Sequence, residues 1–195
     1  MSKHSARPRR ICFYDAFAAY EGAGQMLHFI LQRLDRGRFE PVVLLPREGP
    51  LIEVLRDDGY EVEVMPPKGP LSVYGGRLLE SGLRTKLRAV VDLLAYSRRV
   101  ATWLRAQRVQ LLHCNQTRSA LQAGLGAKRA GVPMVWNVRI REHLPRYLVS
   151  LAAYCADRLI PLTEDSLDDF AGSARLRARA TIIPNAVDIG RFSPE

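Results

Sequence analysis

The sequence has 195 residues, of which 47% are hydrophobic and 25% are charged. This is an ordinary globular composition and length for one domain with a sizeable core, so it excludes a disordered chain. The longest uncharged stretch near a predicted helix, 147–156, is about half as long as a bilayer crossing requires, which excludes a membrane-spanning segment. A net charge of +9 and a pI near 9.9 predict an anionic partner: nucleic acid, an acidic membrane face or a phosphorylated small molecule.

The three cysteines are an odd number without a Cys-x-x-Cys pair, and each lies in an apolar run: Cys12, Cys114 and Cys155. They are typical of reduced core residues in a cytosolic protein. The four histidines show no metal-ligand spacing, so we expect neither a metal nor another cofactor. Acidic residues interrupt the apolar stretch after the basic segment 1–10, which argues against secretion. We therefore expect a cytoplasmic protein that associates peripherally with the inner membrane face.

Strand-like and helix-like runs alternate along the whole chain, which is the pattern of βαβ units with a parallel sheet. The predicted strands cover residues 10–14, 41–45, 61–65, 110–114, 134–138, 158–162 and 181–183. The predicted helices include residues 25–34, 50–58, 83–107 and 117–130. The expected fold is therefore α/β: a single Rossmann-like domain with a mostly parallel sheet of about seven strands and helices on both faces.

The predicted helix 83–107 has one apolar stripe with a period near 3.6 residues, which we expect to face the core. The stripe consists of Leu83, Leu87, Val90, Val91, Leu94, Ala101 and Leu104. The remaining surface is basic, with Arg84, Lys86, Arg88, Arg98, Arg99, Arg105 and Arg108. Two interpretations of these charges stay open: a solvated face that keeps the protein soluble, or a surface that contacts anionic lipid headgroups.

A glycine-rich turn, Gly22-Ala23-Gly24, follows the first strand and leads into a helix. Doubly wound folds bind ligands at this place, and bare glycines let an anion or a sugar approach the backbone. The alternative is a tight strand-to-helix turn without a ligand. A dinucleotide fingerprint would need a third glycine where Leu27 stands and an acid near Arg47 at the end of the second strand, so NAD binding has little support.

His113 and Asn115 lie at and just beyond the end of the predicted strand 110–114. Side chains alternate along a strand, so these two point the same way and Cys114 points the opposite way. We interpret His113 as a core histidine with satisfied hydrogen bonds. Asn115, at the strand tip, is the better candidate for contacting a ligand.

Several segments together resemble the amino-terminal domain of GT-B-type family 4 glycosyltransferases. The segments are Gly-Ala-Gly-Gln at 22–25, Leu-Leu-His-Cys-Asn at 111–115, Gly-Val-Pro-Met-Val-Trp-Asn-Val-Arg at 131–139, Ile-Pro-Leu-Thr-Glu at 160–164, Ile-Pro-Asn-Ala-Val-Asp at 183–188 and Phe-Ser-Pro at 192–194. The most specific is 183–188, because the hinge in that family commonly reads Ile-Pro-Asn-Gly-Val-Asp before Arg-Phe-x-Pro. Ala186 stands here in the glycine position.

The resemblance implies that residues 1–184 form an acceptor-side domain and that residues 185–195 begin an interdomain hinge. The carboxyl-terminal, donor-binding domain would be absent from this chain. The implied activity is retaining transfer of a sugar from a nucleotide-sugar donor to a lipid- or glycan-type acceptor. In the family, the donor-binding domain carries the groups that neutralise the leaving diphosphate, so this half is expected to be inactive alone.

The resemblance also marks Arg139 and Thr163. Arg139 stands where many relatives carry a histidine, and Asn137 replaces the histidine of another family form, so we expect Arg139 to bind a phosphate or carboxylate rather than to transfer protons. The alternative is a structural ion pair with Glu142. Thr163 occupies the place of a family serine, and its alternative role is helix capping. The predicted substrate-binding residues are thus Gly22, Ala23, Gly24, Asn115, Arg139, Glu142 and Thr163, with no catalytic residue assigned.

A second functional hypothesis is a non-catalytic Rossmann-like module that binds a nucleotide or a partner protein. The turn at Gly22 to Gly24 and the side chain of Arg139 would then hold a phosphate without chemistry. Nucleic-acid binding rests on charge alone and lacks aromatic stacking platforms, so no nucleic-acid partner is expected.

Overall fold

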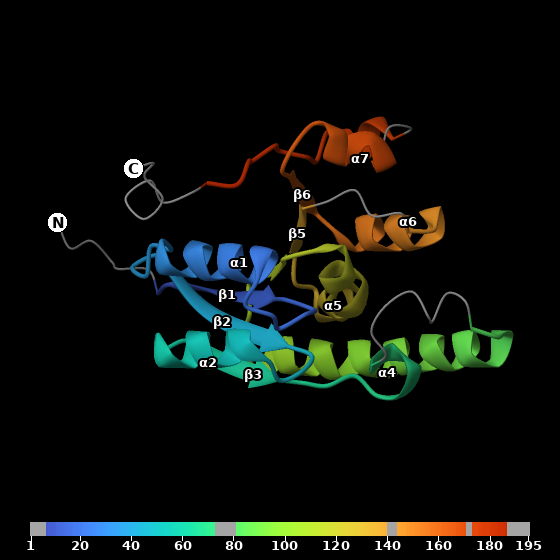
Figure 1. The fold of residues 1–195 in the computed structure, drawn as a ribbon, viewed down its shortest axis with the longest axis horizontal. Coiled ribbons are helices and arrows are strands. Elements are labelled where there is room, and N and C mark those ends of the chain that lie inside the picture. Colours follow the sequence, from blue (N-terminus) through green and yellow to red (C-terminus); the bar gives the residue numbers. More distant parts are fainter. Residues whose placement is uncertain (1–6, 73–80, 140–143, 171–172, 187–195) are drawn as a thin grey trace.

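The computed structural model describes residues 7–72, 81–139, 144–170 and 173–186. Within these residues, six parallel strands form one sheet in the order β3-β2-β1-β4-β5-β6 (Figure 1). The strands are β1 (Arg9–Tyr14), β2 (Phe39–Leu45), β3 (Glu61–Val64), β4 (Leu111–Cys114), β5 (Met134–Val138) and β6 (Arg158–Pro161). The α/β class and the parallel Rossmann-like sheet predicted from the sequence are confirmed.

The seventh predicted strand, 181–183, is not a strand in this structure. The chain there runs beside β6: Leu159 N–H donates to the Arg179 carbonyl, and Thr181 N–H donates to the Leu159 carbonyl, each at 3.0 Å. One isolated bridge, Leu159 with Ala180, and a hydrogen bond from Ile183 N–H to the Pro161 carbonyl, at 3.0 Å, continue this alignment, but no strand is formed among these described residues. Residues 181–186 are exposed, so this segment is an extended edge rather than a buried strand.

Helices cover the sheet on both faces, as predicted. They are α1 (Gly22–Gln32), α2 (Pro50–Asp57), α4 (Leu83–Ala106), α5 (Thr117–Ala130), α6 (Arg146–Cys155) and the short α7 (Ala174–Arg177), with 3-10 turns η1 (Gly69–Ser72) and η2 (Asp165–Phe170). Alternation along β1 separates two cores: Ile11 and Phe13 pack with α1 and α2, whereas Cys12 and Tyr14 pack with α4, α5 and α6. Right-handed crossovers on either side of β1 place the two helix sets on opposite faces.

Close packing joins α4, α5 and α6 on the second face. A Cβ atom at Gly126 would press into Val100 of α4, and one at Gly124 would press into Cys155 of α6. The glycines therefore let the helices approach each other. The end of α5 was correctly predicted, because Gly131 follows it with φ 72°, a left-handed conformation that suits glycine. The three cysteines are all buried and unpaired.

The apolar stripe of α4 is only partly buried, which corrects the prediction that all of it faces the core. Ala101 and Leu104 are buried, but the five residues before them are 37–73% exposed: Leu83, Leu87, Val90, Val91 and Leu94. The reason is the crossing of the two helices: α4 runs across the view in Figure 1 and α5 is seen nearly end-on, with Gly126 of α5 against Val100 in the second half of α4. The first turns of α4 extend beyond this crossing, and none of the other described helices covers the stripe there (Figure 1).

None of the helices in the described part of the chain combines the length and the apolar character needed to cross a bilayer.

Candidate functional site

The candidate site lies at the carboxyl ends of β1, β4 and β5. The sheet order places β1 beside β4, and the chain winds outward in opposite directions from this pair. Such a switch point is where open parallel sheets bind ligands. Three polar side chains directly follow these neighbouring strands: Asp15 after β1, Asn115 after β4 and Arg139 after β5.

Asp15 is the buried anchor of this edge, with 1% of its surface exposed. Its Oδ1 accepts hydrogen bonds from the backbone N–H groups of Phe17 and Ala18, at 2.8 and 3.2 Å. Its Oδ2 accepts from the side-chain amides of Asn115, at 2.6 Å, and Gln116, at 3.5 Å. Both carboxylate oxygens are therefore engaged in holding the turn after β1 and the end of β4.

Asn115 joins the three strand ends to the glycine-rich turn. Its Nδ2 donates to Asp15 and to the carbonyl of Ala23, the latter at 2.9 Å. Its Oδ1 accepts from Arg139 Nη2 at 2.6 Å and from Nε at 3.0 Å. The side chain is fully buried. The sequence correctly places Asn115 at this edge, but in the structure its amide positions other groups.

Arg139 is held in one orientation. Its Nε also donates to the Asn115 carbonyl at 2.9 Å, and its Nη1 donates to Asn185 Oδ1 at 3.2 Å. Burial lowers the pKa of the guanidinium, and the nearby Asp15 carboxylate opposes that change. Asn185 belongs to the exposed segment after β6, so Arg139 links the sheet edge to the predicted hinge. Glu142, the predicted ion-pair partner of Arg139, lies outside the described residues.

The glycine-rich turn has different requirements at its two glycines. Gly22 begins α1 with φ 30°, a conformation that L side chains rarely adopt, and the space around its α-carbon is open. Gly24 is buried, and a Cβ there would clash with the Ala19 carbonyl. The absence of a side chain at position 24 is thus explained by the tight turn itself. Ala23 contributes its carbonyl to Asn115, so the turn is tied to β4.

Thr163 lies just beyond β6, along the same edge of the sheet. It is exposed, and its hydroxyl pairs with the Ser166 hydroxyl at 3.0 Å. The Thr163 carbonyl, rather than its side chain, accepts the Ser166 N–H at 3.2 Å and so begins η2. No hydrogen bond between Thr163 and the Asn115–Arg139 pair is found among the described residues.

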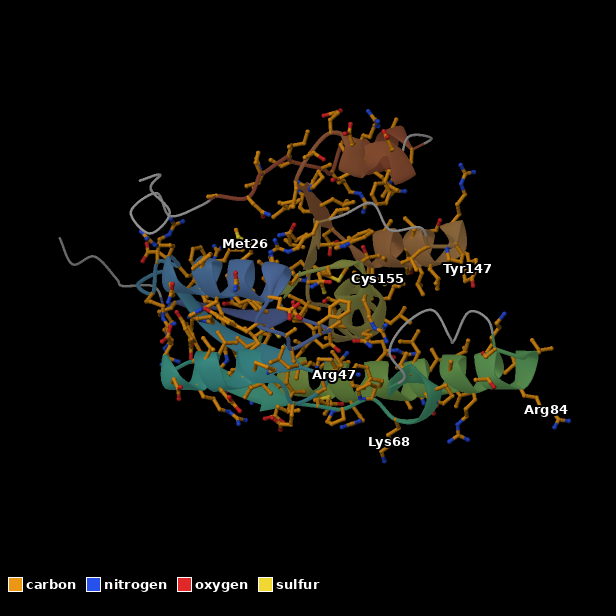
Figure 2. The ribbon with its side chains drawn as sticks, in the orientation of Figure 1. Met26, Arg47, Lys68, Arg84, Tyr147 and Cys155 are labelled. Atoms are coloured by element: carbon orange, nitrogen blue, oxygen red, sulfur yellow. The ribbon has the colours of Figure 1, made fainter. Side chains whose placement is uncertain are left out.

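A groove of about 410 Å³ runs beside Arg139 on the sheet face that carries α1. Its walls come from α1, β4, β5, β6 and the segment 183–186, and Figure 2 shows Met26 on the groove side of α1. Two buried polar side chains line it, His113 and Asn137. His113 Nδ1 and Asn137 Oδ1 lack a hydrogen bond to another residue within the described ranges.

The structure confirms that His113 is buried but not that its hydrogen bonds are satisfied. Desolvation, followed by the positive charge of Arg139, lowers the pKa of this ring to about 4. The imidazole is therefore neutral at physiological pH. Its ring contacts that of Phe13 in a tilted arrangement, with 5.1 Å between the centroids and 44° between the planes.

A second hollow, of about 370 Å³, lies at the same edge near β1, β2 and β3. Arg47 and Glu48 from the loop after β2 and Arg118 from the first turn of α5 line it together with Ala16, and Figure 2 shows where Arg47 lies. Charged side chains and prolines share the lining of this hollow, whereas the groove beside Arg139 is lined mostly by apolar side chains.

The sequence prediction missed Asp15 as a site residue. The sequence did contain a signal for it. Asp15 directly follows an apolar strand and precedes a glycine-rich turn, and a residue in that position lies at the carboxyl edge of a parallel sheet. The buried atoms His113 Nδ1 and Asn137 Oδ1, which have no hydrogen-bond partner among the described residues, left no comparable signal. Their lack of partners depends on which side chains the fold packs around them.

Comparison with known proteins agrees with this geometry. The sequence profile of Glycosyltransferase Family 4 matches residues 20–191. No curated protein sequence matches this chain significantly.

Solved glycosyltransferase structures share the fold at low sequence identity. Anabaena HepE in complex with UDP and glucose is 18% identical with a TM-score of 0.66, over 93% of this chain and 46% of HepE. The lipopolysaccharide outer core galactosyltransferase WaaB, in its apo form, is 11% identical with a TM-score of 0.63, over 92% of this chain and 46% of WaaB. MurG from Acinetobacter baumannii is 13% identical with a TM-score of 0.60, over 82% of this chain and 42% of MurG.

The chain spans less than half the length of each of these three proteins. The profile match, in contrast, covers most of the chain. The protein therefore belongs to Glycosyltransferase Family 4 and has the fold of the amino-terminal domain of GT-B glycosyltransferases.

Proposed function

We propose that this chain is the acceptor-side half of a retaining glycosyltransferase that uses a nucleotide-sugar donor and a lipid- or glycan-type acceptor. In the reaction, the bond between the sugar C1 and the diphosphate oxygen breaks, and the diphosphate leaves with the electron pair. A bond forms between C1 and the acceptor oxygen, and the acceptor hydroxyl releases its proton. The second wall of the donor site would come from a carboxyl-terminal domain joined through the segment that starts at 185.

The observation that carries the proposal is the orientation of Arg139 at the switch point. Asn115 accepts two of its N–H groups, and Asp15 holds Asn115 in turn. A guanidinium with this support presents a fixed positive charge to a phosphate or carboxylate without an ordering cost at the moment of binding. Its contact with Asn185 places that charge beside the proposed hinge, where a second domain would meet the first.

At the switch point itself, neither Asp15 nor His113 is suited to transfer a proton. Asp15 is buried with both oxygens engaged, and His113 is buried with a pKa of about 4. A general base needs access to the proton it removes and a pKa near the working pH. Neither residue meets both conditions, which supports the proposal that this half is inactive or nearly so when it is alone.

The relatives support the choice of substrates. HepE was solved with UDP and with UDP-glucose, and WaaB is a galactosyltransferase of the lipopolysaccharide outer core. A uridine-type nucleotide sugar and a lipid-linked glycan are therefore the first substrates to test with this chain.

The test compares the isolated chain with a two-domain form. Purified residues 1–195 are incubated with UDP-glucose and UDP-galactose, and released UDP is measured. We expect no release above background. A chimera that joins this chain at 186 to the carboxyl-terminal half of HepE should release UDP, and Arg139→Gln in the chimera should reduce that release. Hydrolysis or transfer at an ordinary enzymatic rate by the isolated chain would contradict the proposal.

A further inference from the structure

We propose that the hollow of about 370 Å³ near β1, β2 and β3 binds a sugar that carries a phosphate or carboxylate group. Arg47 and Arg118 hold the anionic group, and Glu48 accepts a hydroxyl group of the sugar. The inference deepens the proposed function, because it assigns such a sugar to the acceptor. Only that assignment rests on the proposed function; the binding itself does not.

The hollow is distinct from the groove beside Arg139. Arg118 and Gln122 of α5 line the hollow, so it lies on the face of the sheet that carries α4 and α5, whereas the groove lies on the face that carries α1. Among the described residues, the hollow and the groove share no lining residue. Ala16 lines the hollow and directly follows Asp15. A ligand in the hollow therefore lies beside the switch point without occupying the space next to Arg139.

Arg47 and Arg118 bring two positive charges to the hollow from separate elements. Arg47, labelled in Figure 2, belongs to the loop after β2, and Arg118 belongs to the first turn of α5. Both residues are half-buried, so their side chains are partly shielded from water. A guanidinium stays charged at any physiological pH, and its planar fork of N–H groups matches a carboxylate or a phosphate. The pair therefore favours an anionic oxygen group over a neutral one.

The amino end of α5 adds to this positive charge. A helix carries a partial positive charge at its amino end, so Arg118 in the first turn stands against the helix dipole. That turn contains no acidic residue, and the side chain of the N-cap, Gln116, makes no capping hydrogen bond. Asp15 accepts from Gln116 at 3.5 Å, but both of its oxygens are already engaged at the strand ends. An anion in the hollow would stabilise an arginine whose position is unfavourable for the helix alone.

Gln122 supplies a further donor at the wall of the hollow. This residue is 4% exposed, and its Oε1 accepts the Tyr14 hydroxyl at 3.0 Å. The bond fixes the amide plane, and Nε2 is then the atom of the amide that can donate to a ligand. No hydrogen bond from Nε2 to another residue is found in the described part of the chain. An oxygen atom of a ligand in the hollow can therefore accept from a buried amide that is held in one orientation.

The rest of the lining suits the body of a sugar. Glu48 is exposed, and its carboxylate can accept hydrogen bonds from hydroxyl groups. Pro46 and Pro67 are buried and form rigid apolar walls with Leu71, against which the C–H groups of a sugar ring can pack. Small-ligand pockets typically have about 300–1,000 Å³, so the hollow is at the small end of that range. One sugar unit with an anionic substituent matches this size and this lining.

The experiment measures binding to the full 195-residue chain by isothermal titration calorimetry at low ionic strength. The probes are glucose 6-phosphate, glucuronate, glucose and inorganic phosphate. We expect at least one of the two charged sugars to bind and glucose not to bind measurably. Inorganic phosphate should bind about tenfold more weakly than the better charged sugar, because it makes no contact with Glu48 or the apolar walls. The two charged sugars distinguish a phosphate-bearing ligand from a carboxylate-bearing one.

A charge-matched pair of variants tests the location. Arg47→Gln/Arg118→Gln should weaken binding of the charged sugar by about tenfold or more, because it removes both guanidinium groups from the hollow. Arg175→Gln/Arg177→Gln makes the same change in net charge at exposed positions on α7 and should bind like the wild type. Circular dichroism and thermal unfolding verify that each variant folds as the wild type does.

A third variant tests the buried amide. Gln122→Glu keeps an oxygen for the Tyr14 hydroxyl but replaces the Nε2 donor with a carboxylate oxygen, so it should also weaken binding of the charged sugar. If this buried substitution prevents folding, the result with the arginine pair decides the question.

Three results would overturn the inference. They are a wild-type chain that binds neither charged sugar, glucose or inorganic phosphate that binds as tightly as the charged sugars, and an Arg47→Gln/Arg118→Gln variant that binds like the wild type. In a chimera that releases UDP, the charged sugar that binds should increase the release, and no increase would refute its assignment to the acceptor. Sugar binding needs no catalysis, so a chimera that releases no UDP would count against the proposed function and not against this site.

Discussion

The side-chain amide of Asn115 donates to the carboxylate of Asp15 across 2.6 Å, and this bond ties the carboxyl end of β4 to that of β1. The same asparagine accepts hydrogen bonds from Arg139 through its Oδ1. Arg139, which contacts Asn185 at the start of the proposed hinge segment, is thus oriented by a neutral residue with no exposed surface. Three predictions concern this network and the turn beside it, and a fourth concerns the buried histidine.

Replacement of Asn115 should destabilise the fold. Asn115→Ala leaves Asp15 Oδ2 and Arg139 without their shared partner in a buried place, which costs about 1–3 kcal/mol of unfolding free energy. Asn115→Asp should cost at least as much, because it sets a second carboxylate against Asp15. Urea unfolding measures both. The exposed Asn185→Ala serves as the control and should change the free energy by less than about 0.5 kcal/mol. Equal effects at positions 115 and 185 would contradict this account.

The neutral state of His113 makes stability depend on pH. Burial and the charge of Arg139 lower its pKa from 6.5 to about 4. Between these values the unfolded chain binds a proton that the folded chain does not, so the unfolding free energy falls as pH falls from 6.5 toward 4. Above pH 6.5 His113 takes nothing from the unfolding free energy. Acidification through the range from 6.5 to 4 lowers that free energy by about 3 kcal/mol at most.

Urea unfolding at about pH 7.5 and about pH 4.5 checks this dependence. The loss of stability between the two conditions should be smaller in His113→Leu than in the wild type, because leucine does not titrate. Identical losses in the two proteins would show that other groups cause the acid sensitivity.

Gly24→Ala should destabilise the turn that leads into α1. The added Cβ meets the backbone carbonyl of Ala19, which cannot rotate away, so we expect a cost of about 1–3 kcal/mol and a lower melting temperature. Gly82→Ala is the matched control, since Gly82 has open space around it and φ −66°. Thermal unfolding followed by circular dichroism compares the two. A Gly24→Ala protein that melts with the Gly82→Ala protein would show that the turn tolerates a side chain.

Nucleotide binding should depend on Arg139. A ligand that binds only the folded state raises the melting temperature, so UDP, GDP and NAD are titrated against the chain in a thermal-shift assay. We expect a rise with UDP, no rise with NAD, and loss of the UDP response in Arg139→Gln. The control Arg179→Gln removes an arginine that bonds backbone carbonyls near α6, away from the switch point. A response to NAD alone would favour a dinucleotide-binding module.

Much of the fold could be predicted from the order of local patterns. Six of the seven predicted strands are present, and the helix Thr117–Ala130 has the predicted ends, because glycine caps and apolar runs act through neighbouring residues. The candidate site was predicted in part for the same reason. Asn115 and Arg139 each follow a strand, and parallel strands end at one edge.

The amino-acid sequence by itself determined the α/β class, the family and the edge at which the site lies. Only the tertiary structure decided which residues of a predicted apolar stripe are buried. The stripe on α4 is continuous in sequence, but α5 crosses α4 near Val100, beyond its first turns, so Leu87 is exposed and Leu104 is buried. Likewise, nothing near His113 in the sequence shows that its Nδ1 is buried without a hydrogen bond to another described residue. The burial of a residue depends on helices and strands that are distant in the sequence and pack against it. Periodicity indicates only on which face of its own helix or strand the residue lies.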